Sequence, residues 1–245
     1  MLPSVLLIGP NKCATTSLHH ELVQQLVACR PTPVPPHSNR LAVRVAHKEI
    51  QFFSRDARFA LGVSWYMRNF NSSRLSPSEA IGCGGRFIDS SPEYFYAQSV
   101  VARVYGAYPS ALRPRLIAVL REPVERGISA FNFYYGIALR KRGVFEQALW
   151  SGGGVTRYSR LAQDQLEALH ANGSKRGAMP KSRTPDATAI EVGFYAEHLR
   201  RWLFVGPERL FVAAFSDIVT NVPAYVARCV LHCSRTLGPG RKERV

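Results

Sequence analysis

The sequence lacks long hydrophobic runs, and this absence sets the first limit on what the protein is. None of its apolar stretches approaches the roughly 18 to 20 residues that span a bilayer. Residues 1–4 also lack the charged start and long apolar core of a signal peptide. We therefore expect no membrane segment in this chain, whose 245 residues are enough to bury a core without disulfide or metal staples.

Acidic residues are scarce. The chain has 17 Asp and Glu against 32 Lys and Arg, a formal net charge of +15. Such an excess of positive charge favours an anionic ligand or substrate. Charge alone does not distinguish a nucleotide, a sulfated glycan and a nucleic acid.

Cysteines are few and irregularly spaced. There are five, an odd number, and they form no C-x-x-C or paired zinc pattern, so no metal site is predicted. Cys229 and Cys233 are four residues apart and would share a helix face, where buried free thiols are the favoured interpretation. Tripeptides beginning at Asn71 and Asn172 fit the N-glycosylation pattern, which applies only in a secretory compartment.

Predicted strands alternate with predicted helices along the chain. Short apolar runs predict strands at residues 4–8, 87–89, 115–120 and 210–215. A helix with Leu18, Leu22 and Leu26 four apart follows the first strand, and Pro123 opens a helix after the third. We expect one α/β domain over residues 1–245, with three layers around a mostly parallel central sheet. In such folds ligands bind at the carboxyl ends of the strands.

Two further segments receive weaker predictions. Residues 151–187 are rich in Gly, Ser, Lys and Arg without lasting periodicity, and they predict a long exposed loop or partly helical insertion. Residues 190–203 show a helical stripe of Ile190, Phe194, Leu199 and Trp202.

Two loops that leave predicted strands carry groups suited to binding anions. The first, residues 9–17, places Lys12 and three hydroxyl residues at the start of a helix, whose free N–H groups favour a phosphate. Its spacing does not fit a nucleotide-triphosphatase loop, which disfavours a nucleotide kinase. In the second loop, Arg121 ends a strand and Ser129 follows eight residues later. The alternative reading makes Lys12 a solvated turn residue and pairs Arg121 with Glu122 or Glu125.

Together the two loops resemble those of sulfotransferases that use 3'-phosphoadenylyl sulfate (PAPS), a family with a P-loop NTPase-like α/β fold. The segments are most similar to those of heparan sulfate glucosaminyl 3-O- and N-sulfotransferases. They run in that family's order from about Val5 to Phe215 and comprise residues 9–18, 48–53, 62–66, 89–95, 121–129 and 193–199.

The resemblance implies a role for each matched residue. Lys12 would stabilise the departing phosphate, and Glu49 would be the general base that takes the acceptor's proton. No metal is required in this scheme. The residues implied in holding PAPS are Lys12, Cys13, Ala14, Thr15, Thr16 and Ser17 for the 5'-phosphosulfate, with Arg121 and Ser129 for the 3'-phosphate.

The implied acceptor contacts are Lys48, Gln51, Trp65 and Ser90. Gln51 stands where the family usually has histidine, and Ser90 where it often has lysine. In isolation, Glu49 would read as an ion-pair partner of Lys48. Residues 238–245 stand in place of the family's closing Lys-Gly-Arg loop.

The resemblance also implies an anionic, heparan-like glycan acceptor, a nucleotide co-substrate, no specific nucleic-acid partner and a Golgi lumen location. Basic residues within 31–58 and 170–184 would line the acceptor cleft, or would simply be solvated. The rival from another class is a polyanion-binding protein of the same fold that has lost catalysis.

Overall fold

Four short strands form the centre of the molecule. They are β1 (Val5–Leu7), β2 (Ile88–Asp89), β3 (Arg115–Leu120) and β4 (Leu210–Ala214), all parallel and ordered β2-β1-β3-β4. The computed structural model describes residues 1–25, 28–32, 48–141, 153–171 and 190–234. All four predicted strands are present within a residue or two of their predicted bounds, and the predicted parallel α/β sheet is confirmed.

Alternating side chains of the strands build two separate cores, one on each face of the sheet. On one face, Val5 and Leu7 join Leu18 and Leu22 of α1 (Thr15–Gln24). On the other face, Leu6 packs within a core rich in buried aromatic rings. The sheet is thus the middle layer of three, as predicted.

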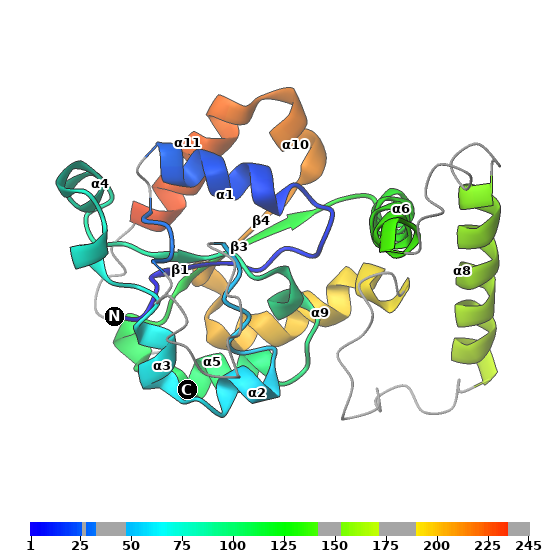
Figure 1. Cartoon of the computed structure of the whole chain (residues 1–245), viewed down its shortest axis with the longest axis horizontal. Helices are drawn as coiled ribbons and strands as arrows, with labels where there is room; N and C mark the ends of the chain where they lie inside the picture. Colours follow the sequence, from blue (N-terminus) through cyan, green and yellow to red (C-terminus); the bar gives the residue numbers. More distant parts are fainter. Residues whose placement is uncertain (26–27, 33–47, 142–152, 172–189, 235–245) are drawn as a thin grey trace, which may run out of the picture.

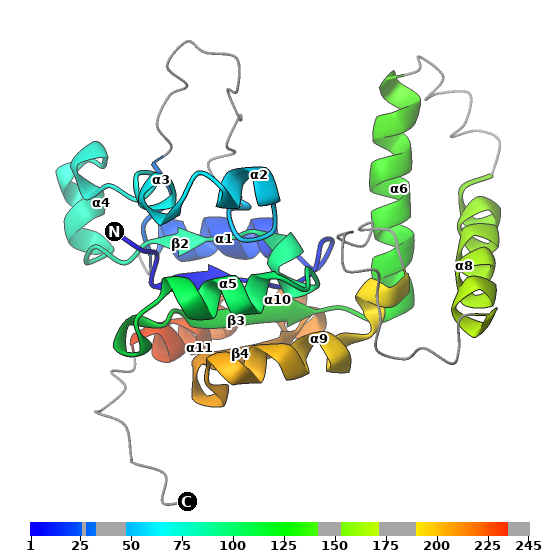
Figure 2. The same ribbon diagram turned by 90° about the horizontal axis from the view of Figure 1, so that it is seen from below.

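The helices divide between these faces (Figure 1). Helices α1, α10 (Phe215–Thr220) and α11 (Val222–Ser234) cover one face. The other face is covered by α2 (Asp56–Phe59), α3 (Val63–Met67), α5 (Val100–Ala107) and α9 (Tyr195–Trp202). Helix α4 (Pro77–Gly82) lies at the side of the molecule where the N-terminus is (Figures 1 and 2).

Two long helices extend beyond the sheet. Helix α6 (Pro123–Lys141) follows β3 directly and stands away from the sheet, with α8 (Gly153–Ala171) beside it (Figures 1 and 2). The prediction of a long loop over residues 151–187 was therefore wrong for 153–171, where its helical alternative holds. Tyr158 of α8 is buried and packs on Phe131 of α6, and Gln165 of α8 accepts a hydrogen bond from the Ile190 amide, so tertiary contacts support this helix.

The predicted helix over residues 190–203 is interrupted. A 3-10 turn at Ile190–Gly193 comes first, and α9 begins only at Tyr195. Phe194, placed on the predicted stripe, is the residue before the helix and is 41% exposed. No helix within the described ranges is long and apolar enough to cross a membrane.

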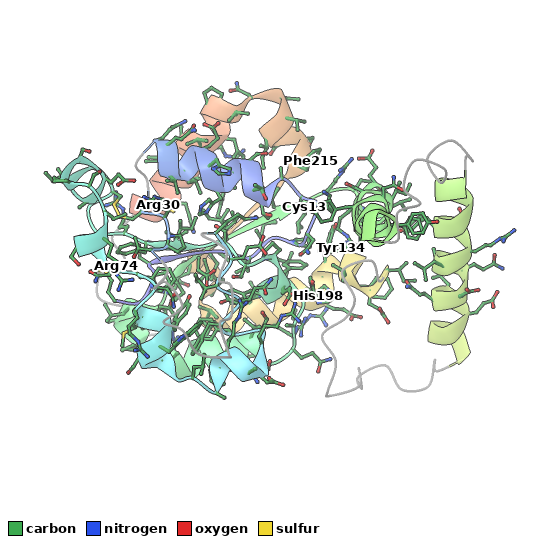
Figure 3. The ribbon with its side chains drawn as sticks, viewed as in Figure 1. Cys13, Arg30, Arg74, Tyr134, His198 and Phe215 are labelled. Atoms are coloured by element: carbon green, nitrogen blue, oxygen red, sulfur yellow. A yellow bond between two sulfur atoms is a disulfide. The ribbon has the colours of Figure 1, made fainter. Side chains whose placement is uncertain are left out.

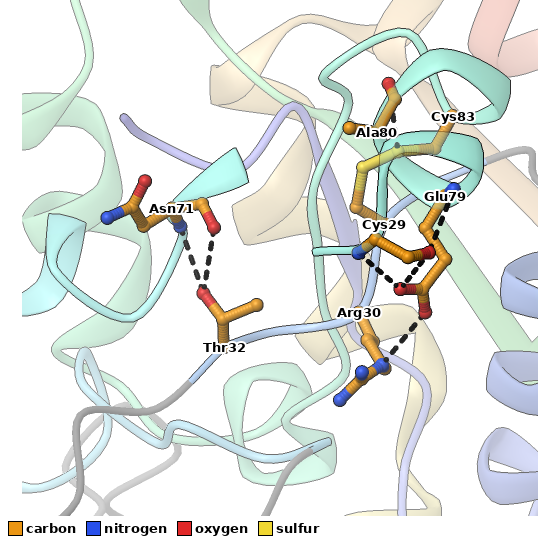
Figure 4. Close-up of a disulfide and its surroundings, with 8 residues drawn as sticks. Cys29, Arg30, Thr32, Asn71, Glu79, Ala80 and Cys83 are labelled. Carbon is orange, nitrogen blue, oxygen red and sulfur yellow. Dashed lines mark hydrogen bonds and ion pairs between the residues drawn. A yellow bond between two sulfur atoms is a disulfide. The ribbon is translucent and has the colours of Figure 1, made fainter. Parts of the chain in front are cut away.

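A disulfide joins Cys29 to Cys83 at the edge of the sheet (Figure 4). Beside it Arg30 pairs with Glu79, and Thr32 accepts a hydrogen bond from the Asn71 amide. The sequence did not predict this bond, because its two cysteines are 54 residues apart and only the fold brings them together. Cys229 is a buried free thiol, as predicted.

Candidate functional site

The loop after β1 leaves the first turn of α1 open. Gly9 lies so close to β3 that an added Cβ would meet the Val119 nitrogen at 2.7 Å. Lys12 and Ala14 both adopt positive φ, 70° and 59°. No side chain caps α1, and its first turn has no acidic residue. The backbone N–H groups at this helix start therefore face outward without a protein acceptor from a cap.

Lys12 is held beside α6. Its Nζ lies 4.1 Å from the centre of the Phe133 ring, and the neighbouring Asn11 Nδ2 donates to the Tyr134 hydroxyl at 2.6 Å. Burial and then repulsion from Arg121 lower the pKa of Lys12. Among the described residues Lys12 makes no ion pair. Figure 3 shows Cys13 of the loop and Tyr134 of α6 at the same end of the sheet.

Arg121 follows the last residue of β3. Its Nε lies 3.2 Å from Glu125 Oε2, and its guanidinium stacks over Phe215. The Tyr195 hydroxyl donates to its carbonyl oxygen at 2.7 Å. The alternative ion pair with Glu125 is thus present, yet Arg121 still acts electrostatically on Lys12. The two cations come from different strand–helix units and meet at one edge of the sheet.

The remaining residues assigned to the donor lie around these two cations. Thr16 and Ser17 are exposed in the first turn of α1, whereas Cys13 and Thr15 are buried. Burial raises the pKa of the Cys13 thiol to about 11, so this group stays protonated. Ser129 is partly buried, two turns into α6.

Glu49 stands within a chain of polar contacts. Lys48 Nζ lies 2.8 Å from Glu49 Oε1 and donates to Thr16 Oγ1 at 2.8 Å. Gln51 Nε2 donates to Glu49 Oε2 at 3.3 Å. The side chains of Lys48 and Glu49 are 15% and 30% exposed, so solvent and ligands still reach them. The alternative reading of Glu49 as the partner of Lys48 is present in the structure, and the same contact links Glu49 to the donor loop.

A buried carboxylate that sequence reasoning missed supports this segment. Asp89 ends β2 and accepts hydrogen bonds from the hydroxyls of Ser91, Tyr66 and Tyr94. It also accepts one from the Ile50 amide at 3.3 Å. Burial raises the pKa of Asp89, although these donors oppose the shift. The position of Asp89 at the end of a predicted buried strand was the sequence feature that could have indicated its buried, structural role.

Ser90 lies inside the protein. It is fully buried, and its hydroxyl lies 2.8 Å from Nδ1 of His19. Its side chain is thus directed into the protein, and its contact with an acceptor stays a prediction. Tyr66 is likewise buried and hydrogen-bonded to Asp89. Trp65 is partly buried and stacks on Phe52, and its contact with an acceptor stays a prediction.

Some of the basic residues proposed to line an acceptor cleft lie within the described residues, and the others lie outside them. Arg55 pairs with Glu93, and Arg58 donates to the Ile50 carbonyl, so both hold the fold together. Lys175, Arg176 and Lys181 lie outside the described residues, as does most of 31–47. No group of three or more potential metal ligands occurs in the part of the chain that the structure describes.

No protein-family model matches the chain. Heparan sulfate glucosamine 3-O-sulfotransferase 5 of Mus musculus is 25% identical over 222 residues, which cover 91% of this chain and 50% of the relative. The bifunctional heparan sulfate N-deacetylase/N-sulfotransferase 3 of Homo sapiens is 26% identical over 209 residues, 84% of this chain and 19% of the relative. The chain thus spans half or less of the length of these relatives.

The fold also matches a solved structure, a sulfotransferase from Alicyclobacillus acidocaldarius. The TM-score is 0.53 at 20% identity, and the alignment covers 99% of this chain and 88% of the other. This likeness establishes the fold, and the sequence similarity to the heparan sulfate enzymes runs over most of the same residues. The chain therefore has the sulfotransferase fold and is related in sequence to the heparan sulfate 3-O- and N-sulfotransferases.

Proposed function

We propose that this protein transfers a sulfuryl group from PAPS to a hydroxyl or amine of a glucosaminyl residue in a heparan sulfate-like glycan. The observation that carries the proposal is that Lys12 and Arg121 follow the adjacent parallel strands β1 and β3 at their carboxyl ends, beside the uncapped start of α1. Two mutually repelling cations next to uncapped N–H groups favour a ligand with several negative charges. The relatives named for this activity extend the proposal from an anion to a sulfuryl donor.

The reaction needs three functions from the protein. The acceptor oxygen or nitrogen attacks sulfur, while the bond between sulfur and the bridging oxygen of the 5'-phosphate breaks. The electron pair of that bond stays on the bridging oxygen, which leaves as part of 3'-phosphoadenosine 5'-phosphate (PAP). The acceptor's proton passes to the Glu49 carboxylate. Charge stabilisation, in-line positioning and a general base account for the catalysis.

The described residues divide these functions among three segments. Lys12 stabilises charge on the bridging oxygen, and the start of α1 with Thr15, Thr16 and Ser17 holds the 5'-phosphate. Arg121 and Ser129 hold the 3'-phosphate, for which the arginine offers a fixed fork of donors. The Glu49 side chain is partly exposed and can meet an acceptor. It is linked to the donor loop through Lys48, which contacts both Glu49 and Thr16.

Calorimetric titration with PAP tests the donor half of this proposal. We expect wild type to bind, and Lys12→Ala and Arg121→Ala each to weaken binding by roughly tenfold or more, because each removes a charge-assisted contact. Arg200→Ala is the matched control, since Arg200 is an exposed arginine of α9. Equal affinity in all four proteins would contradict the donor assignment.

Transfer of labelled sulfate from PAPS to heparosan tests the acceptor half. We expect label on the glycan with wild type and its loss in Glu49→Gln, which keeps the shape of the side chain but cannot take the proton. One observation favours the rival, a polyanion binder without turnover: both carboxylate oxygens of Glu49 already have partners in the protein. PAP binding without transfer to any glycan, with glycan affinity that falls steeply with salt, would support that rival.

We also propose that the protein folds in an oxidising compartment such as the Golgi lumen. The Cys29–Cys83 disulfide supports this, because disulfides persist mainly outside the reducing cytosol. Asn71, the first residue of a glycosylation tripeptide, is partly exposed nearby. Mass spectrometry after thiol alkylation of the denatured but unreduced protein from its native source should find Cys29 and Cys83 blocked from reaction. Alkylation of both would contradict the assignment.

A further inference from the structure

Lys48 occupies a bridging position that its place in the sequence does not reveal. Its carbonyl oxygen accepts a hydrogen bond from the Ser90 amide at 3.0 Å, so residues 48 and 90 lie side by side. Its ammonium reaches Thr16 of the donor loop and Glu49, each at 2.8 Å. One side chain thus joins Glu49 to the donor loop, although Lys48 and Thr16 are 32 residues apart in the chain.

Two described neighbours of Lys48, Ser90 and His19, supply no positive charge of their own. Ser90 is uncharged and turned inward to His19. His19 is 4% exposed, and burial, repulsion from Lys48 and repulsion from His20 lower its pKa to about 4. His19 is therefore neutral at physiological pH, so among these three described residues the positive charge comes from Lys48.

We propose that Lys48 binds the sulfuryl donor and is the second cation, after Lys12, at the group being transferred. The assignment rests on the proposed function, and it moves Lys48 from the acceptor contacts, where the sequence resemblance puts it, to the donor contacts. Thr16 is the hydroxyl expected to hold the 5'-phosphate, so a cation at 2.8 Å from Thr16 Oγ1 lies within reach of the same phosphate oxygens.

The chemistry of an ammonium fits this position. It carries three N–H donors, of which two are directed at Thr16 and Glu49. An oxygen of the sulfuryl donor PAPS can accept a hydrogen bond from the third N–H, or it can take the place of Thr16 as acceptor. The contact between Lys48 and Glu49 remains in either case. As the bond between sulfur and the bridging oxygen breaks, Lys48 then stabilises the growing charge from the side of the base. Lys12 does so from the side of α6.

The test separates three roles of Lys48 by measuring PAP affinity, kcat and the KM of the glycan. In Lys48→Met we expect PAP to bind about tenfold more weakly and kcat to fall roughly a hundredfold, because a charge-assisted contact to the transferring group is gone. The KM of the glycan should stay within about twofold. Lys48→Arg, which keeps the charge, should recover most of the PAP affinity. Arg200→Met, an exposed loss of one positive charge, is the control and should change none of these values.

Other patterns overturn the assignment. A raised glycan KM with unchanged PAP affinity would make Lys48 an acceptor contact. A reduced kcat with unchanged PAP affinity would leave it only as a positioning residue for Glu49. Circular dichroism and thermal unfolding of each variant show whether it folds, and Lys48→Arg serves as the test if Lys48→Met does not fold. Failure of wild type itself to bind PAP would overturn the proposed function and this assignment together, whereas binding by wild type and equally by Lys48→Met would overturn this assignment alone.

Discussion

The two strand–loop–helix units that form the site, β1–α1 and β3–α6, treat the start of their helices in opposite ways. Helix α1 has no side-chain cap and no acid in its first turn. At the start of α6, the Glu122 carboxylate accepts from the amides of Val124 and Glu125, at 3.0 and 2.6 Å. The first unit leaves its donors for a ligand, whereas the second satisfies them internally and contributes a side chain, Arg121.

The same contrast appears in the two cations. Lys12 makes no ion pair among the described residues, and its pKa is lowered. Arg121 is already partly neutralised by Glu125. The difference teaches that two units of the same architecture can differ in what they offer a ligand. In the proposed function, β1–α1 supplies the anion site and β3–α6 adds a partly compensated charge to it.

The strongest test of this contrast compares Lys12→Ala with Arg121→Ala. We expect Lys12→Ala to reduce sulfate transfer by roughly a hundredfold or more, because it removes an uncompensated cation from the transferring group. Arg121→Ala should reduce it by only about tenfold, since Glu125 already screens that charge. Initial rates at saturating glycan measure both. Equal losses in the two variants would remove the distinction between the units.

A second test concerns His19, a buried histidine of α1 in the first unit. Its pKa of about 4 lies below the ordinary value of 6.5, so the unfolded chain takes up a proton between these pH values and the folded chain does not. The stability that His19 gives is complete above about pH 6.5 and is lost as the pH falls to about 4. Between pH 7 and pH 4 we expect the unfolding free energy of His19→Gln to fall by roughly 2 to 3 kcal/mol less than that of wild type, since one pKa unit is worth about 1.4 kcal/mol.

Urea unfolding of both proteins from pH 7 to pH 4 measures the effect. Gln24→Ala is the control, because Gln24 is an exposed, uncharged residue of the same helix. An identical fall in wild type and His19→Gln would show that another group causes the acid sensitivity.

The backbone of the donor loop gives a third test. Ala14 adopts φ 59°, a left-handed conformation that a β-branched side chain strongly disfavours. We expect Ala14→Val to destabilise the fold by about 1 to 2 kcal/mol and to weaken PAP binding, because the loop must shift. Ala14→Gly, which accepts this φ without strain, should keep full PAP affinity. Thermal unfolding and calorimetry give the two values, and normal PAP binding by a destabilised Ala14→Val would mean that the loop geometry does not carry the affinity.

The sequence predicted the frame of this site better than its interior. The strands and the two loops follow from local patterns. Each predicted strand is a buried apolar run, and the residue that ends the run, Gly9 or Arg121, marks where the chain leaves the sheet. The inward turn of Ser90 and the bridge from Lys48 to Thr16 depend on pairing between distant segments, which periodicity does not report. The Asp89 hydrogen bonds were missed for the same reason: three hydroxyls from separate positions converge on one carboxylate.

The smallest expected effect comes from the cap of α6. Two backbone amides donate to Glu122 and lower its pKa, which shows that the carboxylate is held as the cap. Glu122→Ala should lower Tm by only about 2 to 4 °C, the range expected for loss of one cap in a chain of this size. It should leave PAP affinity within about twofold, because the β3–α6 unit is proposed to hold the ligand through the side chains of Arg121 and Ser129 and not through its helix start. If Glu122→Ala instead strengthened PAP binding severalfold, the freed amides of α6 would be binding the ligand as those of α1 do, and the two units would differ only in which of them is capped.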